Sequence, residues 1–269
     1  MQVVFLIMLF IIGSCAGSFL CCQARRLKLR ESLSKKDLKF LKHRSVCLSC
    51  KYQLKWYDNI PIISWLLLRG KCRKCKKKIG KLEFLSEIGT GIAFLLIGTT
   101  IDITTTDFLP WVIFVFVVLL TLALSFLAIY DGAYGELPTF ALFFSIIFAL
   151  AIAALTICQQ SIADSFDSSF IINPCFAVLI LGGIYLGLFI ISKGKWIGDG
   201  DWILGTAIAI ALGLPWLALI VLFLSNLLAC LVMFPLMKGK YHKKIHFGPF
   251  LVAAFVIVFS FANFFISMI

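Results

Sequence analysis

The feature that most constrains this chain is a series of apolar runs, most of them about as long as a bilayer is thick. A membrane-spanning helix needs about 20 consecutive, mainly apolar residues. The long apolar segments are Gln2–Cys22, Phe84–Ile101, Phe108–Tyr130, Leu137–Ile157, Ile171–Ser192, Trp202–Met237 and Phe247–Ile269. Because 61% of the 269 residues are hydrophobic and only 14% are charged, a soluble domain is excluded. We therefore predict an all-α polytopic membrane protein.

The segment Trp202–Met237 is too long for one crossing. Gly213, Pro215 and Trp216 fall inside it, where one helix is expected to end and another to begin. Dividing the segment there predicts about eight transmembrane helices. One kinked helix followed by a re-entrant loop is the alternative interpretation.

Charge predicts the orientation of these helices, because Lys and Arg near the ends of spans stay on the cytoplasmic side. Nineteen of the 25 basic residues lie between Arg25 and Lys81. The others are Lys193, Lys195, Lys238, Lys240, Lys243 and Lys244. The loops predicted to lie opposite carry Asp102, Asp107, Asp164 and Asp167. Both termini are therefore expected outside, and a single crossing over Trp202–Met237 would place the last basic cluster on the wrong side.

The basic residues follow the first apolar segment instead of preceding it, so this segment is expected to be an uncleaved anchor and not a secretory signal. The predicted organisation is a first transmembrane helix at 1–22, a basic cytoplasmic insert at 23–82 and a transmembrane bundle at 83–269. The net charge of +12 lies next to the membrane and carries no nucleic-acid-binding motif. We expect anionic lipid headgroups, not nucleic acid, to meet this charge.

Two cysteine pairs in the insert form a specific local pattern. Cys47 and Cys50 are followed by Cys72 and Cys75, so two Cys-x-x-Cys turns flank a loop. This is the spacing of a tetrathiolate zinc site, and disulfides are disfavoured in the reducing cytoplasm. We predict a structural zinc ion, because four thiolates leave no open position for water. Redox-active pairs, or no role, are the alternatives.

Two aspartates at the ends of apolar segments are the main candidates for chemistry. Carboxylates in membrane segments are costly and usually persist where catalysis or ion movement uses them. Asp131 ends the third span, and Asp201 closes Gly198-Asp199-Gly200-Asp201 before the sixth. If the bundle brings these ends together, the two carboxyls share a proton and act as base and acid on a water molecule. Gly198 and Gly200 are expected to permit positive φ and close backbone approach.

These aspartates also have other interpretations. Asp131 can be a solvated carboxylate beside Gly132, and Asp199 or Asp201 can be the N-cap of the next helix. Paired membrane aspartates also serve proton-coupled transport, although transport needs access from both sides and these residues are predicted to lie at one face. A zinc-organised docking module anchored by the spans is a third possibility, but it leaves Asp131 and the glycines unexplained.

An ordered set of motifs runs through nearly the whole chain. It consists of Gly17-Ser18-Phe19-Leu20, the two cysteine pairs with Trp56–Leu66 and Arg69–Lys71 between them, Ile129-Tyr130-Asp131 with Leu137-Pro138, and Gly198–Asp201. Together these motifs resemble those of the type IV prepilin peptidases, membrane aspartic proteases that trim the leaders of pilin and pseudopilin precursors. The resemblance implies that Asp131 and Asp201 are the catalytic pair. Two departures, Cys21-Cys22-Gln23 and Thr139, leave these residues unchanged.

The resemblance also implies a substrate and a place of action. Such enzymes of the bacterial plasma (inner) membrane serve type IV pilus assembly and protein secretion. They cut on the cytoplasmic side, after a Gly between a short basic leader and an apolar helix. Many also methylate the new N-terminus with S-adenosylmethionine, although this sequence has no Gly-rich nucleotide motif of the Rossmann kind. Glu83, Glu87 and Glu136 are candidates to meet the positive charges of the leader.

Overall fold

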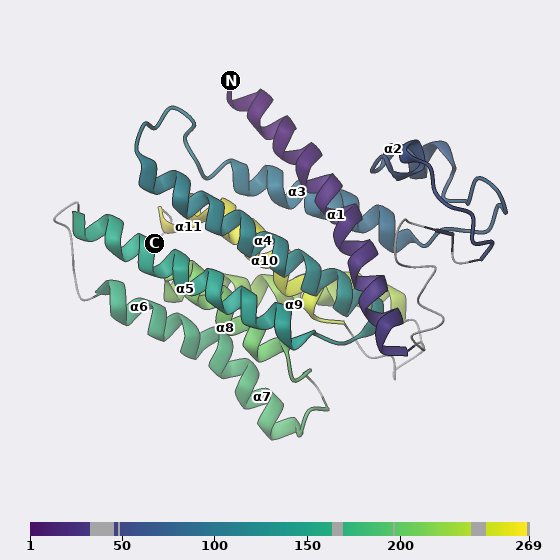
Figure 1. The fold of residues 1–269 in the computed structure, drawn as a ribbon. Coiled ribbons are helices and arrows are strands. Elements are labelled where there is room, and N and C mark those ends of the chain that lie inside the picture. The colour runs from purple at the N-terminus through teal and green to yellow at the C-terminus, as the bar shows by residue number, and fades with distance from the viewer. Residues whose placement is uncertain (33–45, 48, 163–168, 196, 238–245, 268–269) are drawn as a thin grey trace. The chain divides into compact units, whose positions relative to one another are not determined.

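The computed structural model describes residues 1–32, 46–47, 49–162, 169–195, 197–237 and 246–267 (Figure 1). Its helices in chain order are α1 (Gln2–Ser32), η2 (Trp56–Asn59), α2 (Ile63–Leu67), α3 (Lys81–Gly98), α4 (Phe108–Tyr134), α5 (Thr139–Ile162), α6 (Ser169–Val178), η3 (Leu179–Gly183), α7 (Ile184–Ser192), α8 (Asp201–Leu212), α9 (Pro215–Met237), α10 (Gly248–Ser260) and α11 (Ala262–Ile266). Within these residues the β-type pairing is limited to two isolated antiparallel bridges, Val46 with Gln53 and Lys71 with Lys78. The all-helical prediction is confirmed.

Five helical stretches in the described residues are long and apolar enough to cross a membrane: α1, α4, α5, Ile171–Ser192 and α9. α8 and α10 are apolar but shorter. Together with α3 they account for the eight predicted segments, each of which forms helix. The polytopic membrane architecture is therefore confirmed, and the length of the helices supports a full crossing for five of them.

The predicted break in the apolar stretch Trp202–Met237 is also confirmed. α8 ends at Leu212 because Gly213 takes the left-handed conformation, with φ of 68°, and its N–H bonds to the carbonyl of Ala209. Left-handed glycine commonly ends a helix, and proline is favoured in the first turn of the next. α9 begins at Pro215. The stretch is therefore two helices and not one kinked helix.

Residues Met1–Gln2 and Leu96–Ile269 form one compact unit, the bundle. α4 packs against α5 and α10, and α8 packs against α5, α6 and η3. The apolar side chains fully buried in these helices include Leu120, Leu124, Leu127, Leu204, Ile208, Leu251 and Phe255. Because α4 carries no charged residue before Asp131, its buried face is continuous up to that carboxylate.

A π-helical turn, η3, shapes the contact between α7 and α8. Such turns widen a helix locally and are frequent at functional sites. A Cβ added to Gly182 would lie 2.3 Å from Thr206 Oγ1, and one added to Gly205 would lie 3.2 Å from the ring of Tyr185. The two glycines therefore allow a close approach of α8, the helix that starts at Asp201.

Residues Val3–Leu95 form the second compact unit. In it α1 and α3 meet at small residues. A Cβ added to Gly13 would lie 2.7 Å from Phe94 Cβ, and one added to Gly17 would lie 2.4 Å from the carbonyl oxygen of Ser86. Gly13-x-x-x-Gly17 is the small-residue spacing that lets membrane helices pack closely.

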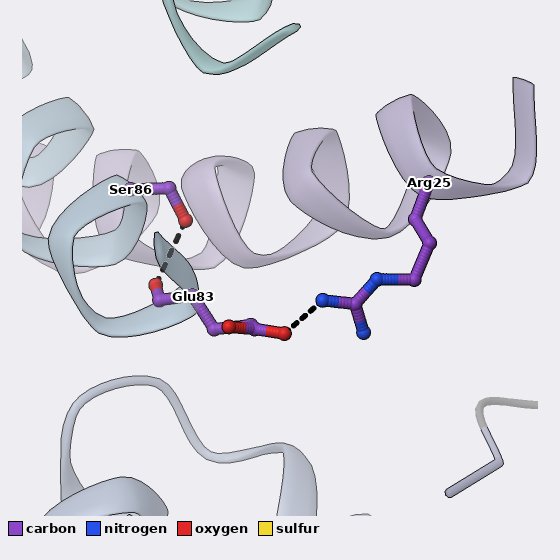
Figure 2. Close-up of polar contacts among 3 residues, drawn as sticks. All are labelled: Arg25, Glu83 and Ser86. Atoms are coloured by element: carbon purple, nitrogen blue, oxygen red, sulfur yellow. Dashed lines mark hydrogen bonds and ion pairs between the residues drawn. The ribbon is translucent and has the colours of Figure 1, made fainter. Parts of the chain in front are cut away.

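Figure 2 shows how the C-terminal part of α1 is tied to the start of α3. The Arg25 guanidinium pairs with the Glu83 carboxylate, and the Ser86 hydroxyl donates to the Glu83 carbonyl at 2.8 Å. α1 continues past its predicted end at Cys22 to Ser32, so this basic segment is helical. The ion pair therefore joins two helix ends.

The insert packs on α3 through α2 and the turn before it. Trp65 stacks on Phe84 with ring centroids 4.4 Å apart, and the Ile62 N–H donates to Glu87 Oε2 at 2.7 Å. Ile62 has φ of 64°, which is unfavourable for a β-branched residue. The buried Glu87 carboxylate therefore holds a strained turn of the insert.

The predicted division into 1–22, 23–82 and 83–269 remains a prediction, and the two compact units separate instead between Leu95 and Leu96. Several charges used to predict the orientation lie outside the described residues: Lys35, Lys36, Lys39, Lys42, Arg44, Asp164, Asp167, Lys238, Lys240, Lys243 and Lys244.

Candidate functional site

The last turn of α4 carries Asp131. α4 ends at Tyr134 because Gly135 takes the left-handed conformation, with φ of 70°, and its N–H donates to the Asp131 carbonyl at 2.8 Å. The Asp131 residue is 6% exposed, and its Oδ2 accepts a hydrogen bond from the Gly248 N–H at 2.9 Å. The alternative of a solvated loop carboxylate is therefore wrong.

Asp201 is the first residue of α8 and is also 6% exposed. Its Oδ2 accepts the Gly198 N–H at 2.9 Å, whereas the N-cap of α8 is Gly200 and no side chain caps the helix. Asp201 is therefore not the N-cap of its own helix. Asp199 is exposed, so burial distinguishes the two acidic residues of this motif.

The expected role of the glycines in this motif is wrong in one respect. Neither Gly198 nor Gly200 has positive φ, and Gly200 has φ of −86°. The expected close approach is present. A Cβ added to Gly200 would lie 2.7 Å from Leu137 Cβ, and one added to Gly198 would lie 3.1 Å from Asp201 Oδ2. Packing space, not backbone conformation, explains these glycines.

Asp131 and Asp201 lie at the same end of the bundle. The loop before Asp201 contacts Leu137, which belongs to the short connection that follows α4. The two carboxyl groups interact electrostatically. Two buried carboxyls that repel each other tend to share one proton, which provides an acid and a base side by side. The structure thus places the two aspartates that the sequence singled out at the same end of the bundle.

Sequence reasoning missed the residues around Asp131. His246 Nδ1 lies 3.7 Å from Asp131 Oδ1, on the segment that also supplies the Gly248 N–H. Gly248 followed by Pro249 is a recognisable helix start. Nothing in the sequence, however, indicates that a helix 117 positions further along meets Asp131.

A buried polar cluster on α7 and α9 was also missed. Tyr185 is 2% exposed, its hydroxyl lies 3.2 Å from Ser225 Oγ, and Asn226 Nδ2 donates to it at 3.4 Å. The Tyr185 ring also packs edge-on against Phe247, with centroids 5.5 Å apart, and the residue interacts electrostatically with Asp201. Tyr185 thus connects α7 to Phe247, at the start of α10, and to Asp201, at the start of α8.

The four cysteines of the insert converge on one point. Their sulfur atoms all lie within 4.8 Å of one another. Cys47 Sγ lies 3.9 Å from Cys75 Sγ, and Cys50 Sγ lies 4.0 Å from Cys72 Sγ. A tetrahedral ion with metal–sulfur bonds of about 2.3 Å places its sulfur ligands about 3.8 Å apart. All four thiols are free, and their arrangement can hold a metal ion.

Both cysteine pairs lie in the same kind of backbone turn. The Lys51 N–H donates to the Cys47 carbonyl at 2.8 Å, and the Lys76 N–H donates to the Cys72 carbonyl at 3.0 Å. Lys51 and Lys76 both have left-handed φ, of 54° and 58°. Two copies of one turn therefore present their thiols to each other, a repeat that the spacing of the cysteines only suggested.

The thiols of this cluster differ in acidity. Desolvation disfavours the Cys47 thiolate, but hydrogen bonds from the backbone of Cys50 and Ser49 and from neighbouring thiols outweigh it and lower the pKa of Cys47 to about 6. The Tyr52 backbone stabilises the Cys50 thiolate, but desolvation and the surrounding thiols outweigh this and raise the pKa of Cys50 to about 11. A bound cation would be needed to ionise all of the thiols together.

Among the three acidic residues expected to meet a basic leader, Glu83 and Glu87 form defined contacts inside the chain. Glu83 pairs with Arg25, and Glu87, 7% exposed, accepts the Ile62 N–H. Glu87 is therefore unavailable to a peptide. Glu136, exposed in the connection after α4, keeps the predicted role as a candidate.

Comparison with known proteins points to one family. Residues 11–101 match the family model described as Bacterial Peptidase A24 N-terminal domain. The prepilin leader peptidase/N-methyltransferase of Vibrio cholerae is 31% identical over 264 residues, covering 96% of this chain and 98% of that protein. Proteins of the same name match from Myxococcus xanthus, 40% identical over 90 residues (34% of this chain, 25% of the relative), and from Aeromonas hydrophila, 27% identical over 219 residues (78% and 69%). No solved structure matches the chain significantly.

Proposed function

The chain belongs to the prepilin leader peptidase/N-methyltransferase family, and on this premise we propose that it is a membrane-embedded aspartic endopeptidase. Its substrates are the precursors of type IV pilin-like proteins, whose basic leader it removes at the cytoplasmic face. The observation that supports this function most directly is the buried pair Asp131 and Asp201, whose carboxyl groups interact at one end of the bundle. A site at the end of membrane helices suits a substrate that lies partly in the bilayer itself.

In the proposed reaction, one carboxylate of the pair takes a proton from a water molecule held between Asp131 and Asp201. The water oxygen bonds to the carbonyl carbon of the scissile peptide, while the other carboxyl gives its proton to the carbonyl oxygen. The resulting diol collapses with cleavage of the C–N bond. The leaving nitrogen takes the proton from the first carboxyl, and a hydroxyl proton returns to the second. The pair regains its starting state without a covalent enzyme intermediate.

Gly198 and Gly200 form the active-site loop in this proposal. The Gly198 N–H holds one oxygen of Asp201, and Gly200 packs the loop against Leu137. Both contacts restrict where the Asp201 carboxyl lies relative to Asp131, and such fixed geometry contributes strongly to rate.

The basic residues support an active site that faces the cytoplasm, with both termini outside, in a multi-pass protein of the bacterial plasma membrane. Lys193 and Lys195 immediately precede the loop of Asp201, and Lys and Arg near span ends mark the cytoplasmic side. Membrane lipids are the proposed partners of the insert. Trp56 and Leu67 are 79% and 77% exposed on a basic segment, and tryptophan and basic residues favour the headgroup region.

We propose zinc as the metal of the insert, held by Cys47, Cys50, Cys72 and Cys75. A tetrathiolate zinc ion cross-links the turns that bind it and stabilises their fold. Its role is structural, and the peptidase reaction does not involve it.

The names of the relatives include N-methyltransferase activity. We propose that this chain likewise methylates the new N-terminal amine, with S-adenosylmethionine as the methyl donor. In the described residues no donor site is recognisable, so the proposal rests on the family alone. A gain of about 14 Da on the mature N-terminus would report the transfer.

Cleavage of a purified pilin precursor by the detergent-solubilised protein tests the peptidase proposal. Asp131→Asn and Asp201→Asn should each lower the rate by roughly 1,000-fold or more. Asp199→Asn, which changes the exposed aspartate of the same motif, should cut at close to the wild-type rate. An intact precursor with folded wild-type protein would refute the proposal and favour the alternative of proton-coupled transport. Normal cutting by both site variants would refute the catalytic role of the two aspartates. Mass spectrometry of the product reports methylation in the same experiment.

A further inference from the structure

The start of α10 contacts Asp131 from two sides. The Gly248 N–H donates to Asp131 Oδ2 at 2.9 Å, and His246 Nδ1 lies 3.7 Å from Asp131 Oδ1. One oxygen therefore meets a hydrogen-bond donor, and the other meets a side chain that becomes a cation when protonated.

Gly248 is required by this close approach. A Cβ added to it would lie 2.9 Å from Asp131 Oδ2 and 3.3 Å from Asp131 Cβ. Its φ is not positive, so the glycine is explained by space and not by conformation. Because Gly248 is the first residue of α10, its N–H belongs to the partially positive end of that helix. This end stabilises negative charge on Asp131.

His246 is placed by a second contact. A Cβ added to Gly135 would lie 2.8 Å from His246 Cε1, so the imidazole packs on the residue that ends α4. The 3.7 Å separation from Asp131 is an ion-pair distance and is too long for a hydrogen bond. The imidazole therefore acts on the carboxylate chiefly through its charge.

Asp201 has a different environment. Its carboxylate accepts the Gly198 N–H, and among the described residues no Lys, Arg or His forms an ion pair with it. Two like charges at close range do not both persist. Asp201 also lies at the positive end of a helix, as the first residue of α8, and it too accepts one backbone N–H, so the difference between the two carboxyls is the His246 imidazole beside Asp131. The shared proton goes to the carboxyl whose negative charge is less stabilised, and this is Asp201.

We infer that His246 and Gly248 are positioning residues that keep Asp131 the ionised member of the pair. This inference rests on the proposed peptidase function and assigns its roles. Asp131 is the base that takes the proton of the attacking water, and Asp201 is the acid that gives its proton to the carbonyl oxygen.

Other titratable groups near this pair bear on a pH measurement. The relevant segments are the described parts of α4, α10, α7, the helices packed on α4 and α10, and the loop after α4. Their titratable groups are Tyr130, Tyr134, Glu136, Cys158, Tyr185, Asp201 and Cys230. Tyrosine and cysteine ionise at basic pH in model peptides, so only the carboxyl groups among these bear on the acid limb.

The test uses His246→Phe, which removes the imidazole but keeps a ring against Gly135. We expect kcat to fall roughly tenfold with KM unchanged, because in this proposal His246 acts through the Asp131 carboxylate and not on the substrate. The acid limb of kcat/KM should move to higher pH by about half a unit, because Asp131 is harder to ionise without the cation. His246→Gln also removes the charge and should lose about as much in kcat, because the 3.7 Å contact is too long for a hydrogen bond to replace it. Gly248→Ala should lose about 100-fold, because its methyl group displaces the Asp131 carboxyl.

Asp131→Asn, measured alongside, separates the two proposals. An intact precursor with folded wild-type protein refutes the peptidase function itself, and substantial activity in Asp131→Asn refutes the catalytic role of Asp131. If Asp131→Asn is inactive while His246→Phe keeps the wild-type kcat and acid limb, only the positioning inference is wrong. A lower kcat with an unmoved acid limb would make Asp201 the base and overturn the assignment. Thermal unfolding of each variant identifies any loss of fold, and His246→Gln keeps the test decisive if His246→Phe does not fold.

Discussion

Substituting Gly200 by alanine tests whether the loop of Asp201 is positioned by its contact with the connection after α4. The added Cβ would lie 2.7 Å from both Cβ and Cδ1 of Leu137, whereas ordinary van der Waals contact begins at 3.4 Å. Leu137 Cβ is bonded to the backbone and cannot rotate away, so one of the two segments must move by about 1 Å. A displacement of that size in a catalytic group costs about 100-fold in rate. This loss corresponds to about 2.7 kcal/mol of transition-state stabilisation.

The assay is single-turnover cleavage of a pilin precursor by purified variants in detergent. Gly132→Ala is the matched control, because it adds a methyl group next to Asp131 but its Cβ would lie 3.6 Å from Pro249 Cγ, an ordinary contact. We expect Gly132→Ala to stay within about threefold of wild type and Gly200→Ala to lose about 100-fold. A wild-type rate for Gly200→Ala would refute the reasoning, and equal losses in both variants would show that the packing distance does not decide the outcome.

Three further predictions concern the insert. Glu87→Ala should destabilise the insert by about 1–3 kcal/mol, because the partly buried Ile62 N–H loses its acceptor. Hydrogen exchange of the Ile62 amide should accelerate, and unchanged protection would contradict this role. Cys47→Ser should abolish metal retention during purification, measured by elemental analysis, whereas Cys158→Ser on α5 should retain the wild-type metal content. Equal metal content in the two variants would exclude the four cysteines of the insert as the metal ligands. After chelation at pH 7, Cys47 should be alkylated first and Cys50 last, because the pKa of Cys47 is lowered to about 6 and that of Cys50 is raised to about 11. The rate at Cys47 should fall as the pH drops below about 6, where its thiolate is protonated, and peptide mass spectrometry would reveal any other order.

Local features made the helices and the cysteine cluster predictable. The break before Pro215 follows from the conformational preferences of Gly213 and of proline. The cysteine cluster follows from two short spacings, because two residues between thiols allow one turn to present both sulfurs. Such properties depend on neighbouring residues, so the sequence carries them without reference to the rest of the fold.

Other roles depended on contacts that local sequence does not encode. The sequence makes Glu87 a candidate to meet the positive charges of a leader, but the fold buries it against the backbone of Ile62. Gly200 was expected to need positive φ, but its requirement comes from Leu137, a residue in another loop. In both cases the residue type was singled out correctly, and the physical reason came from a distant partner.

The sequence by itself determined the all-helical membrane architecture, because a hydrocarbon layer requires long apolar segments whose backbone hydrogen bonds are satisfied internally. It also marked Asp131 and Asp201 as unusual, since carboxylates are costly in such segments. Only the tertiary structure decided what surrounds them. The His246 side chain and the Gly248 amide meet Asp131 because α10 packs on α4. Helix packing depends on shape complementarity between distant surfaces, and no local pattern of residues specifies it.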